Sequence, residues 1–243
     1  MIYRPQRILC VALASLAVLV AFTLTALPLL AQNSELQQKV EQIKQAAAMN
    51  KQMLAQYTWN ETVTISLKGE EKKQEHFQVQ LGPDGKPQKT SLDAPASDES
   101  GKREGRLKKH IVEKKTEEYE EYADQIKDLI QQYVPPERDK LQQAYQQGNI
   151  LVGPTGDAPG QYRLVISNYI KQGDNMTLIA DQAQKDLVSL TISTYLSDPS
   201  DAVKVTVTFV REPNGPNHTS SQVINGVSKQ LTIAIQDSNY QRM

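Results

Sequence analysis

The sequence of 243 residues is poor in the residue types that most often hold metal ions or form disulfides. It contains one cysteine, Cys10, and three histidines, His76, His110 and His218, with no helical or close spacing between any two of them. No H-E-x-x-H or paired-cysteine pattern, no G-x-S-x-G elbow and no phosphate-binding loop occurs. We therefore predict no catalytic residue, no metal site and no cofactor.

Neither sign of charge is in large excess, and aromatic residues are scarce. The chain has 27 basic and 28 acidic residues, with a formal net charge of −1 at pH 7. Nucleic-acid-binding proteins usually carry a clear basic excess, so we predict that nucleic acid is not a partner. Only three Phe and one Trp are present, and a core of Val, Ile and Leu in a wide sheet favours an apolar pocket.

The one long apolar run lies at the N-terminus and is typical of a secretory signal peptide. Arginines precede an apolar segment over residues 8–22, and small residues follow near Ala31. The run is long enough to cross a bilayer, but Pro28 weakens its end. We predict that residues 1–31 are a cleaved signal peptide, and a retained N-terminal membrane anchor is the alternative. Cleavage would remove Cys10 and leave an exported, periplasmic or extracellular protein that does not span the membrane.

Residues 32–243 are predicted to form one domain that begins with a helix and three strands. Ser34 and Gln37 form a capping-box pattern, and an apolar stripe continues from there to Leu54. From Tyr57 the hydrophobic period changes to two, which predicts a half-buried antiparallel strand. Two more strands are expected at 77–81 and 87–92, separated by turn sequences that are rich in glycine and proline.

The middle of the chain predicts a loop and then helices. Residues 93–105 contain almost nothing that can be buried, so we expect a mobile loop there. Residues 106–148 predict a helical insertion, because apolar side chains recur at three or four residues until VPPE ends the first helix. A second helix then runs to Gly148, which gives a helical hairpin or a kinked pair of helices.

From Gln161 onward, short alternating runs are separated by turn sequences every 8–12 residues, which predicts an antiparallel meander. The fold class is therefore α+β. We expect a strongly curved antiparallel sheet or incomplete β-barrel of nine or ten strands, covered on its concave side by the helical hairpin and the N-terminal helix.

This element order resembles the periplasmic lipoprotein carriers of the LolA and LolB type. The segments YTWNETVTISLKGE, QYVPPE and SDPSDAVKVTV are also similar to segments of uncharacterised secreted bacterial proteins. The resemblance implies a LolA-like half-barrel over residues 32–243, whose cavity between sheet and helices takes up acyl chains, and a lipid or lipoprotein as the partner. No position matches the arginine that helps to hold the lid of such carriers, so no functional residue is transferred from them.

Glu61 is a candidate site residue because it lies on the apolar face of its strand, between Trp59 and Val63. Burial of an unpaired carboxylate is costly. We therefore expect either an ion pair with a basic residue on the helical cover or a role in ligand binding or acid–base chemistry. The residues predicted to line the cavity are Trp59, Glu61, Val63, Ile65, Tyr119, Tyr122, Ile126, Leu164 and Leu190, and the wider inward set adds Leu129, Ile166, Leu178, Ile192, Val205 and Val207.

A basic segment at the start of the helical insertion is the second candidate. Positive charge at a helix N-terminus opposes the helix dipole, so helix formation alone does not account for it. The segment is either a solvated face balanced by acidic neighbours or a patch that meets anionic lipid or an acidic partner. Its residues are Lys102, Arg103, Arg106, Lys108, Lys109, Lys114 and Lys115.

Three classes of function agree with these patterns. The first is a non-enzymatic envelope protein that binds or carries a hydrophobic or acyl ligand between sheet and helices. The second is an envelope protein-interaction or sensor module without such a ligand, and the third is a hydrolase whose site is assembled from distant residues.

Overall fold

The computed structural model describes residues 48–93, 106–156 and 158–243, except for the side chains of 106–116 and 138. The predicted signal peptide, most of the predicted N-terminal helix and nearly all of the predicted loop at 93–105 lie outside these residues. Within them, a helical segment over 48–54 leads directly into the first strand.

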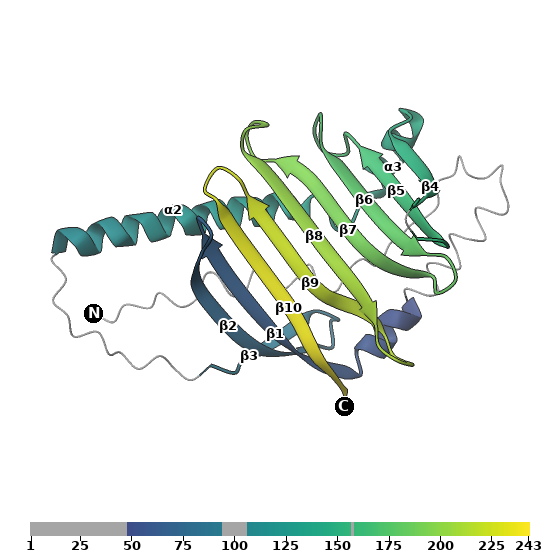
Figure 1. The fold of residues 1–243 in the computed structure, drawn as a ribbon, viewed down its shortest axis with the longest axis horizontal. Coiled ribbons are helices and arrows are strands. Elements are labelled where there is room, and N and C mark those ends of the chain that lie inside the picture. Colours follow the sequence, from purple (N-terminus) through teal and green to yellow (C-terminus); the bar gives the residue numbers. More distant parts are fainter. Residues whose placement is uncertain (1–47, 94–105, 157) are drawn as a thin grey trace.

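Ten strands form one open antiparallel sheet, which confirms the predicted α+β class (Figure 1). Its strand order is β3-β2-β1-β10-β9-β8-β7-β6-β5-β4, so β1 pairs with the last strand of the chain and the edges are β3 and β4. The strands are β1 (Tyr57–Leu67), β2 (Glu70–Leu81), β3 (Pro87–Ser91), β4 (Ile150–Pro154), β5 (Gln161–Ser167), β6 (Asn175–Asp181), β7 (Asp186–Tyr195), β8 (Ala202–Arg211), β9 (Asn217–Gly226) and β10 (Leu231–Arg242).

Two helices connect the edge strands β3 and β4. Helix α2 (Arg106–Gln131) crosses one face of the sheet, here called the inner face, and α3 (Arg138–Gln146) lies at the end of the sheet that carries β4 and β5 (Figure 1). The predicted helical insertion is therefore present. Among the described helices, none combines the length and the apolarity that a bilayer crossing requires.

Two strands differ from the sequence-based expectation. Strand β4 was not predicted, because five residues that include a glycine and a proline give too short a pattern to recognise. Strand β2 begins at Glu70, whereas the sequence predicted a start near Phe77. The first residues of β2 are polar and largely exposed, so they show no apolar alternation. Hydrogen bonding to β1 along its length, and not a hydrophobic pattern, forms this part of β2.

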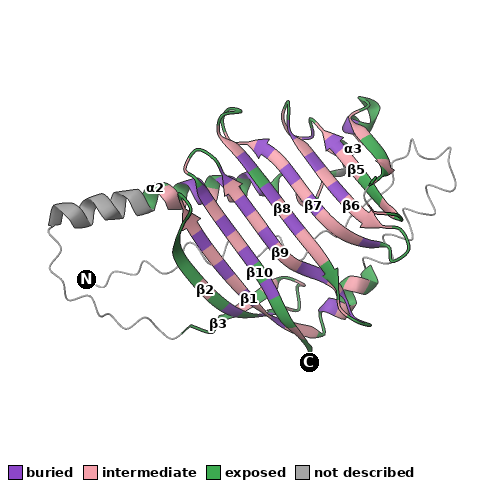
Figure 2. Ribbon diagram, in the orientation of Figure 1, coloured by how far each residue is buried: buried purple, intermediate pink, exposed green. Residues whose placement is uncertain are grey.

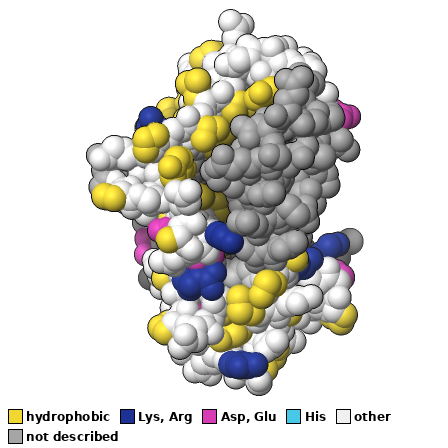
Figure 3. Space-filling view, turned by 90° about the vertical axis from the view of Figure 1, so that its right-hand side faces the viewer, with side chains coloured by type: hydrophobic (Ala, Val, Ile, Leu, Met, Phe, Trp, Pro, Cys, Tyr) yellow, Lys and Arg dark blue, Asp and Glu magenta, His cyan; other side chains and the backbone are white. Residues whose placement is uncertain are grey.

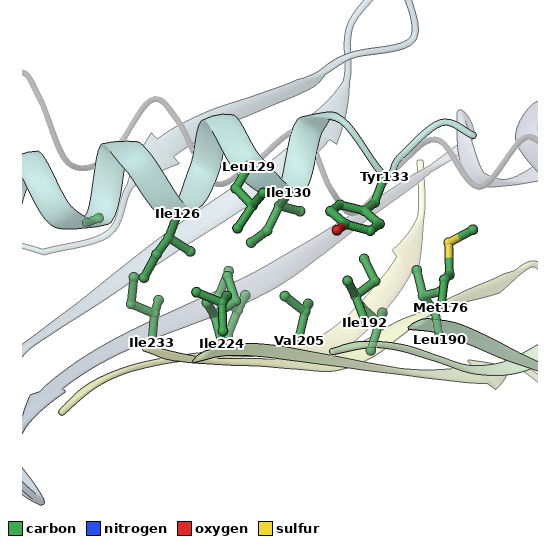
Figure 4. Close-up of a cluster of buried hydrophobic side chains, with 14 of the residues drawn as sticks. Ile126, Leu129, Ile130, Tyr133, Met176, Leu190, Ile192, Val205, Ile224 and Ile233 are labelled. Carbon is green, nitrogen blue, oxygen red and sulfur yellow. The ribbon is translucent and has the colours of Figure 1, made fainter. Parts of the chain in front are cut away.

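The inner face of the sheet and the C-terminal half of α2 form the core. Buried and partly exposed positions alternate along the central strands, as period-two patterns require (Figure 2). Ile126 and Ile130 of α2 point toward Ile224, Val205 and Ile192 of the sheet (Figure 4). The helix and the sheet therefore pack through directly apposed aliphatic side chains in this region.

Gly226 at the end of β9 lies directly against side chains of α2. A Cβ atom there would lie 2.6 Å from Cε1 of Tyr122 and 2.7 Å from Cδ1 of Ile126. A side chain larger than hydrogen does not fit at this contact. Tyr122 is also fixed by its hydroxyl, which donates to Asp201 at 2.7 Å.

A satisfied polar network ties the end of α2 to the sheet. The Tyr133 hydroxyl donates to Asp174 at 2.6 Å, and it lies 2.7 Å from the hydroxyl of Thr194. Asp174 also accepts three backbone N–H groups, from Tyr169, Ile170 and Lys171. Burial and the hydrogen bond to Asp174 raise the pKa of Tyr133 well above its usual range, so its hydroxyl stays protonated.

Candidate functional site

Two carboxylates lie side by side on the inner face, away from the contact with α2. In the strand register, the cross-strand neighbours of Glu61 on β1 are Asp237 on β10 and Phe77 on β2. Both acidic side chains are buried, with exposed fractions of 2% for Glu61 and 6% for Asp237. Like charges in adjacent buried positions repel, so this arrangement requires a cation, a proton or a bound group to stabilise it.

Lys89 supplies the cation for one of the two carboxylates. It lies on the edge strand β3, and its ammonium passes over the ring of Phe77, 5.4 Å from the ring centroid, to form a salt bridge with Glu61. The predicted internal ion pair of Glu61 is thus present. The expected location of its partner was wrong, because the basic residue comes from the edge of the sheet and not from the helical cover.

Asp237 has no such partner. Neither of its carboxylate oxygens has a hydrogen-bond partner in the part of the chain that the structure describes. Burial, followed by the charge of Glu61, raises the pKa of Asp237 to about 8, and Lys89 opposes this shift. The Asp237 carboxyl is therefore mostly protonated at neutral pH.

Three more buried polar groups near these carboxylates also have no hydrogen-bond partner among the described residues. They are the indole N–H of Trp59 on β1, the amide oxygen of Gln222 on β9 and the hydroxyl of Thr219 on β9. An unsatisfied buried polar group costs on the order of 1–3 kcal/mol, so several in one place call for an explanation. We refer to the following six residues as the polar cluster: Trp59, Glu61, Lys89, Thr219, Gln222 and Asp237.

A stack of three rings lies beside the polar cluster. The ring of Tyr240 stacks on Trp59 at 5.3 Å and on His218 at 3.5 Å between centroids. An irregularity in the pairing of β1 with β10, where Asn239 has a φ of 55°, places Tyr240 on the same side as Trp59. Burial, followed by the charge of Asp237, raises the pKa of Tyr240, and its hydroxyl donates to the carbonyl of Thr219.

An apolar row runs across the sheet from the polar cluster to the β4 edge. Each of its members is the cross-strand partner of the next, and it begins beside Gln222. The apolar row consists of Val207, Leu190, Leu178, Leu164 and Val152, on β8, β7, β6, β5 and β4 respectively. Four inter-strand spacings separate Gln222 from Leu164, a span of about 19 Å.

The apolar row changes from buried to exposed along its length. Val207 and Leu190 are buried, Leu164 is half-buried, and Val152 at the edge is 70% exposed. Hydrophobic side chains are also visible on the surface in the view toward the end that carries β4 and α3 (Figure 3). The row thus connects an exposed apolar edge with buried polar groups.

The polar cluster borders the region where α2 contacts the sheet. Gln222 is two residues from Ile224 along β9, about 7 Å, and the Ile224 side chain faces α2 (Figure 4). Asp237 is four residues from Ile233, whose side chain also faces α2 (Figure 4). The polar cluster therefore lies on the inner face next to the part that packs against α2.

The predicted inward residues lie on the inner face or on α2, as the hydrophobic pattern indicated. Those that are buried are Trp59, Glu61, Val63, Ile65, Tyr122, Ile126, Leu129, Ile166, Leu178, Leu190, Ile192, Val205 and Val207. Tyr119 and Leu164 are only half-buried. Their role in ligand binding stays a prediction. Tyr122 and Ile126 are residues of α2, and Ile65 is the cross-strand partner of Ile233, whose side chain faces α2 (Figure 4).

The predicted basic patch falls outside what the structure describes. Lys102 and Arg103 are not among the described residues, and the side chains of Arg106, Lys108, Lys109, Lys114 and Lys115 are not described. The interaction of this patch with anionic lipid stays a prediction.

The sequence analysis missed four members of the polar cluster. Asp237 follows Leu231, Ile233 and Ile235 at alternate positions, so the same reasoning that identified Glu61 could have found it. Gln222 stands two residues before Ile224 in the same way. Lys89 gives no such signal, because its strand carries no apolar alternation.

The polar cluster presents hydrogen-bonding groups that have no partner among the described residues. It offers carboxyl and amide oxygens as acceptors and one indole N–H as a donor, next to aliphatic side chains. Among the described residues, no group of three or more His, Cys, Asp or Glu side chains could hold a metal ion.

Two solved structures are similar to this chain. One is a LolA superfamily protein from Nitrosomonas europaea, with 7% identity and a TM-score of 0.36, and the match covers 84% of this chain and 93% of that one. The other is a DUF1329 family protein from Desulfovibrio piger, with 11% identity, a TM-score of 0.35 and the same coverage. No protein-family model and no curated protein matches the chain.

Proposed function

We propose that this protein is an exported, non-enzymatic envelope protein that binds a hydrophobic or acyl ligand along the inner face of its sheet. The observation that supports this most is the polar cluster at the buried end of the apolar row. A face that served only as a core would gain stability from apolar side chains at the positions of Asp237 and Gln222. Polar groups kept there at a cost are typical of a binding site.

The predicted leader over residues 1–31 and the single domain over 32–243 belong to this proposal. Cleavage would release the domain into the periplasm or the extracellular space, where a lipid or lipoprotein is the partner that fits an apolar row with a polar end. A retained anchor would place the same site at a membrane surface.

The test uses the full chain, expressed with its own leader in a Gram-negative host. Fractionation and the intact mass of the product locate the protein and show whether residues 1–31 are removed. Organic extracts of the purified protein are then analysed by mass spectrometry. We expect an envelope location and about one apolar molecule per chain.

Two matched variants test whether the ligand binds along the apolar row. Val207→Phe enlarges the side chain beside Gln222, whereas Val205→Phe lies under α2 (Figure 4). Overpacking destabilises both by roughly 1–3 kcal/mol, so uptake of a fluorescent acyl probe is normalised to the folded fraction. We expect only Val207→Phe to reduce uptake.

Two results would contradict the proposal. If no lipid is extracted and no probe is taken up, the second class of function, an envelope protein-interaction or sensor module that has no ligand, is favoured. Release of a cleaved probe by the wild type but not by Asp237→Asn would instead favour the hydrolase.

A further inference from the structure

The charges of the polar cluster are not balanced. It contains two carboxyl groups and one ammonium, and the ammonium of Lys89 is already paired with Glu61. The titratable groups that face Asp237 are Glu61 on β1, Lys89 on β3 and Tyr240 on β10. If Asp237 ionises, the cluster has one negative charge in excess and no further cation from these groups to balance it.

Its hydrogen-bonding capacity is unbalanced in the same direction. When Asp237 is ionised, the atoms without a partner among the described residues include three acceptors, the two oxygens of Asp237 and the amide oxygen of Gln222, whereas in the protonated carboxyl one of these oxygens is a donor. The one obligatory donor is the indole N–H of Trp59, and the Thr219 hydroxyl can act in either role. A group that satisfies this set must donate more hydrogen bonds than it accepts.

We infer that the polar cluster binds the positively charged, N–H-donating head group of an apolar ligand, a primary ammonium, whose chain lies along the apolar row. This inference rests on the proposed function. An ammonium has three donors and no acceptor, so it satisfies Asp237 and Gln222 together and balances the charge. A carboxylate or phosphate would add negative charge beside two carboxyl groups, and the site disfavours both.

Proton release is an independent consequence. Because the pKa of Asp237 is raised to about 8, the free protein holds a proton there at pH 7. An ammonium favours the carboxylate form, so binding of the ammonium ligand releases this proton. A neutral or anionic head group has no such effect.

The experiment compares four ligands with the same sixteen-carbon chain on the purified full chain at pH 7: hexadecylamine, hexadecanamide, hexadecanol and palmitate. Affinity is measured by displacement of a fluorescent acyl probe, and proton release by calorimetry in two buffers of different ionisation enthalpy. We expect the amine to bind at least tenfold more tightly than palmitate and to release a proton.

The variant Asp237→Asn keeps the shape and removes the charge. We expect it to weaken amine binding about tenfold, to abolish the proton release and to leave palmitate binding unchanged or tighter. Asp198→Asn, at an exposed carboxylate, is the control and should change neither. If Asp237→Asn does not fold, Gln222→Leu removes one acceptor and should still reduce the preference for the amine.

The outcomes separate the two proposals. If no ligand of the series binds, the proposed function fails. If all four bind with similar affinity, or the amide or alcohol binds best without proton release, the protein binds chains but the head-group inference is overturned. An unchanged amine affinity in both Asp237→Asn and Gln222→Leu also overturns it and indicates that internal water satisfies the cluster.

Discussion

Glu61 and Asp237 are cross-strand partners on β1 and β10, and both are buried. Among the described residues, Lys89 forms its salt bridge with Glu61 and not with Asp237, and burial together with the charge of Glu61 raises the pKa of Asp237 to about 8. The sequence positions of the two residues are far apart, and the pairing of the first strand with the last brings them together. Their proximity has a measurable consequence for the pH dependence of stability.

The contribution of Asp237 to stability should fall as the pH rises from about 4 to about 8. The folded state binds the Asp237 proton more tightly than the unfolded chain does, so this contribution is complete below the unfolded pKa and is lost as the pH passes the folded pKa. Asp237→Asn removes it. Between pH 5 and pH 7, the difference in unfolding free energy between wild type and variant should change by about 2–3 kcal/mol.

Urea unfolding at several pH values measures this difference. Asp198→Asn is the control, because this exposed carboxylate has a lowered pKa from its hydrogen bonds with Ser200. Parallel pH profiles for wild type and Asp237→Asn would show that Asp237 is not protonated in the folded protein at pH 7.

Loss of Lys89 should be more harmful than loss of the charge on Glu61. Lys89→Met leaves two buried carboxyl groups without a cation, which we expect to cost about 3–5 kcal/mol. Glu61→Gln costs less, because the neighbouring Asp237 can ionise and take over the ammonium. Chemical denaturation gives both values, and Lys72→Met at the exposed pair with Glu70 is the control and should have almost no effect.

The same variants test the role of Glu61 in the site. Glu61→Gln should alter the uptake of an acyl probe as well as stability if the polar cluster contacts the ligand. A loss of stability with unchanged uptake would make Glu61 a purely structural residue. Equal losses of stability for Lys89→Met and Glu61→Gln would show that Asp237 does not replace Glu61.

Gly226→Ala should destabilise the protein by about 1–3 kcal/mol, because the new methyl group would overlap Tyr122 and Ile126 of α2. Gly153→Ala is the matched control, since a Cβ at this strand glycine meets nothing within 4 Å. Thermal unfolding compares the two. Adding Ile126→Val should recover part of the loss, and no recovery would mean that the strain lies elsewhere.

Tyr133→Phe should cost about 1–3 kcal/mol, because it removes the buried hydroxyl between Asp174 and Thr194 and leaves the Thr194 hydroxyl without that partner. Tyr145→Phe, at a residue that is 39% exposed, should have almost no effect. Equilibrium unfolding measures both variants, and similar values for the two would assign little energy to this network.

Much of the fold follows from local patterns that the sequence displays. In β1 and β8, alternation of apolar and polar residues determines both the strand and the face that it buries, because successive side chains point to opposite sides. Helix α2 follows from apolar residues that recur every three or four positions along the chain. The position of Glu61 on a buried face follows from the same rule.

The polar cluster depends on contacts that no local pattern contains. Pairing of β1 with β10 decides that Asp237 lies beside Glu61, and strand partners so distant in the chain are selected by the whole sheet. Lys89 reaches Glu61 only because β3 follows β2 at the edge, within the length of one side chain. The irregularity at Asn239 turns Tyr240 inward against the alternation that the sequence predicts. The periods of the backbone thus account for most of the strands, for the helices and for the faces that they bury, whereas strand β4, the first half of β2 and the grouping of the polar side chains depend on strand pairing in the tertiary structure.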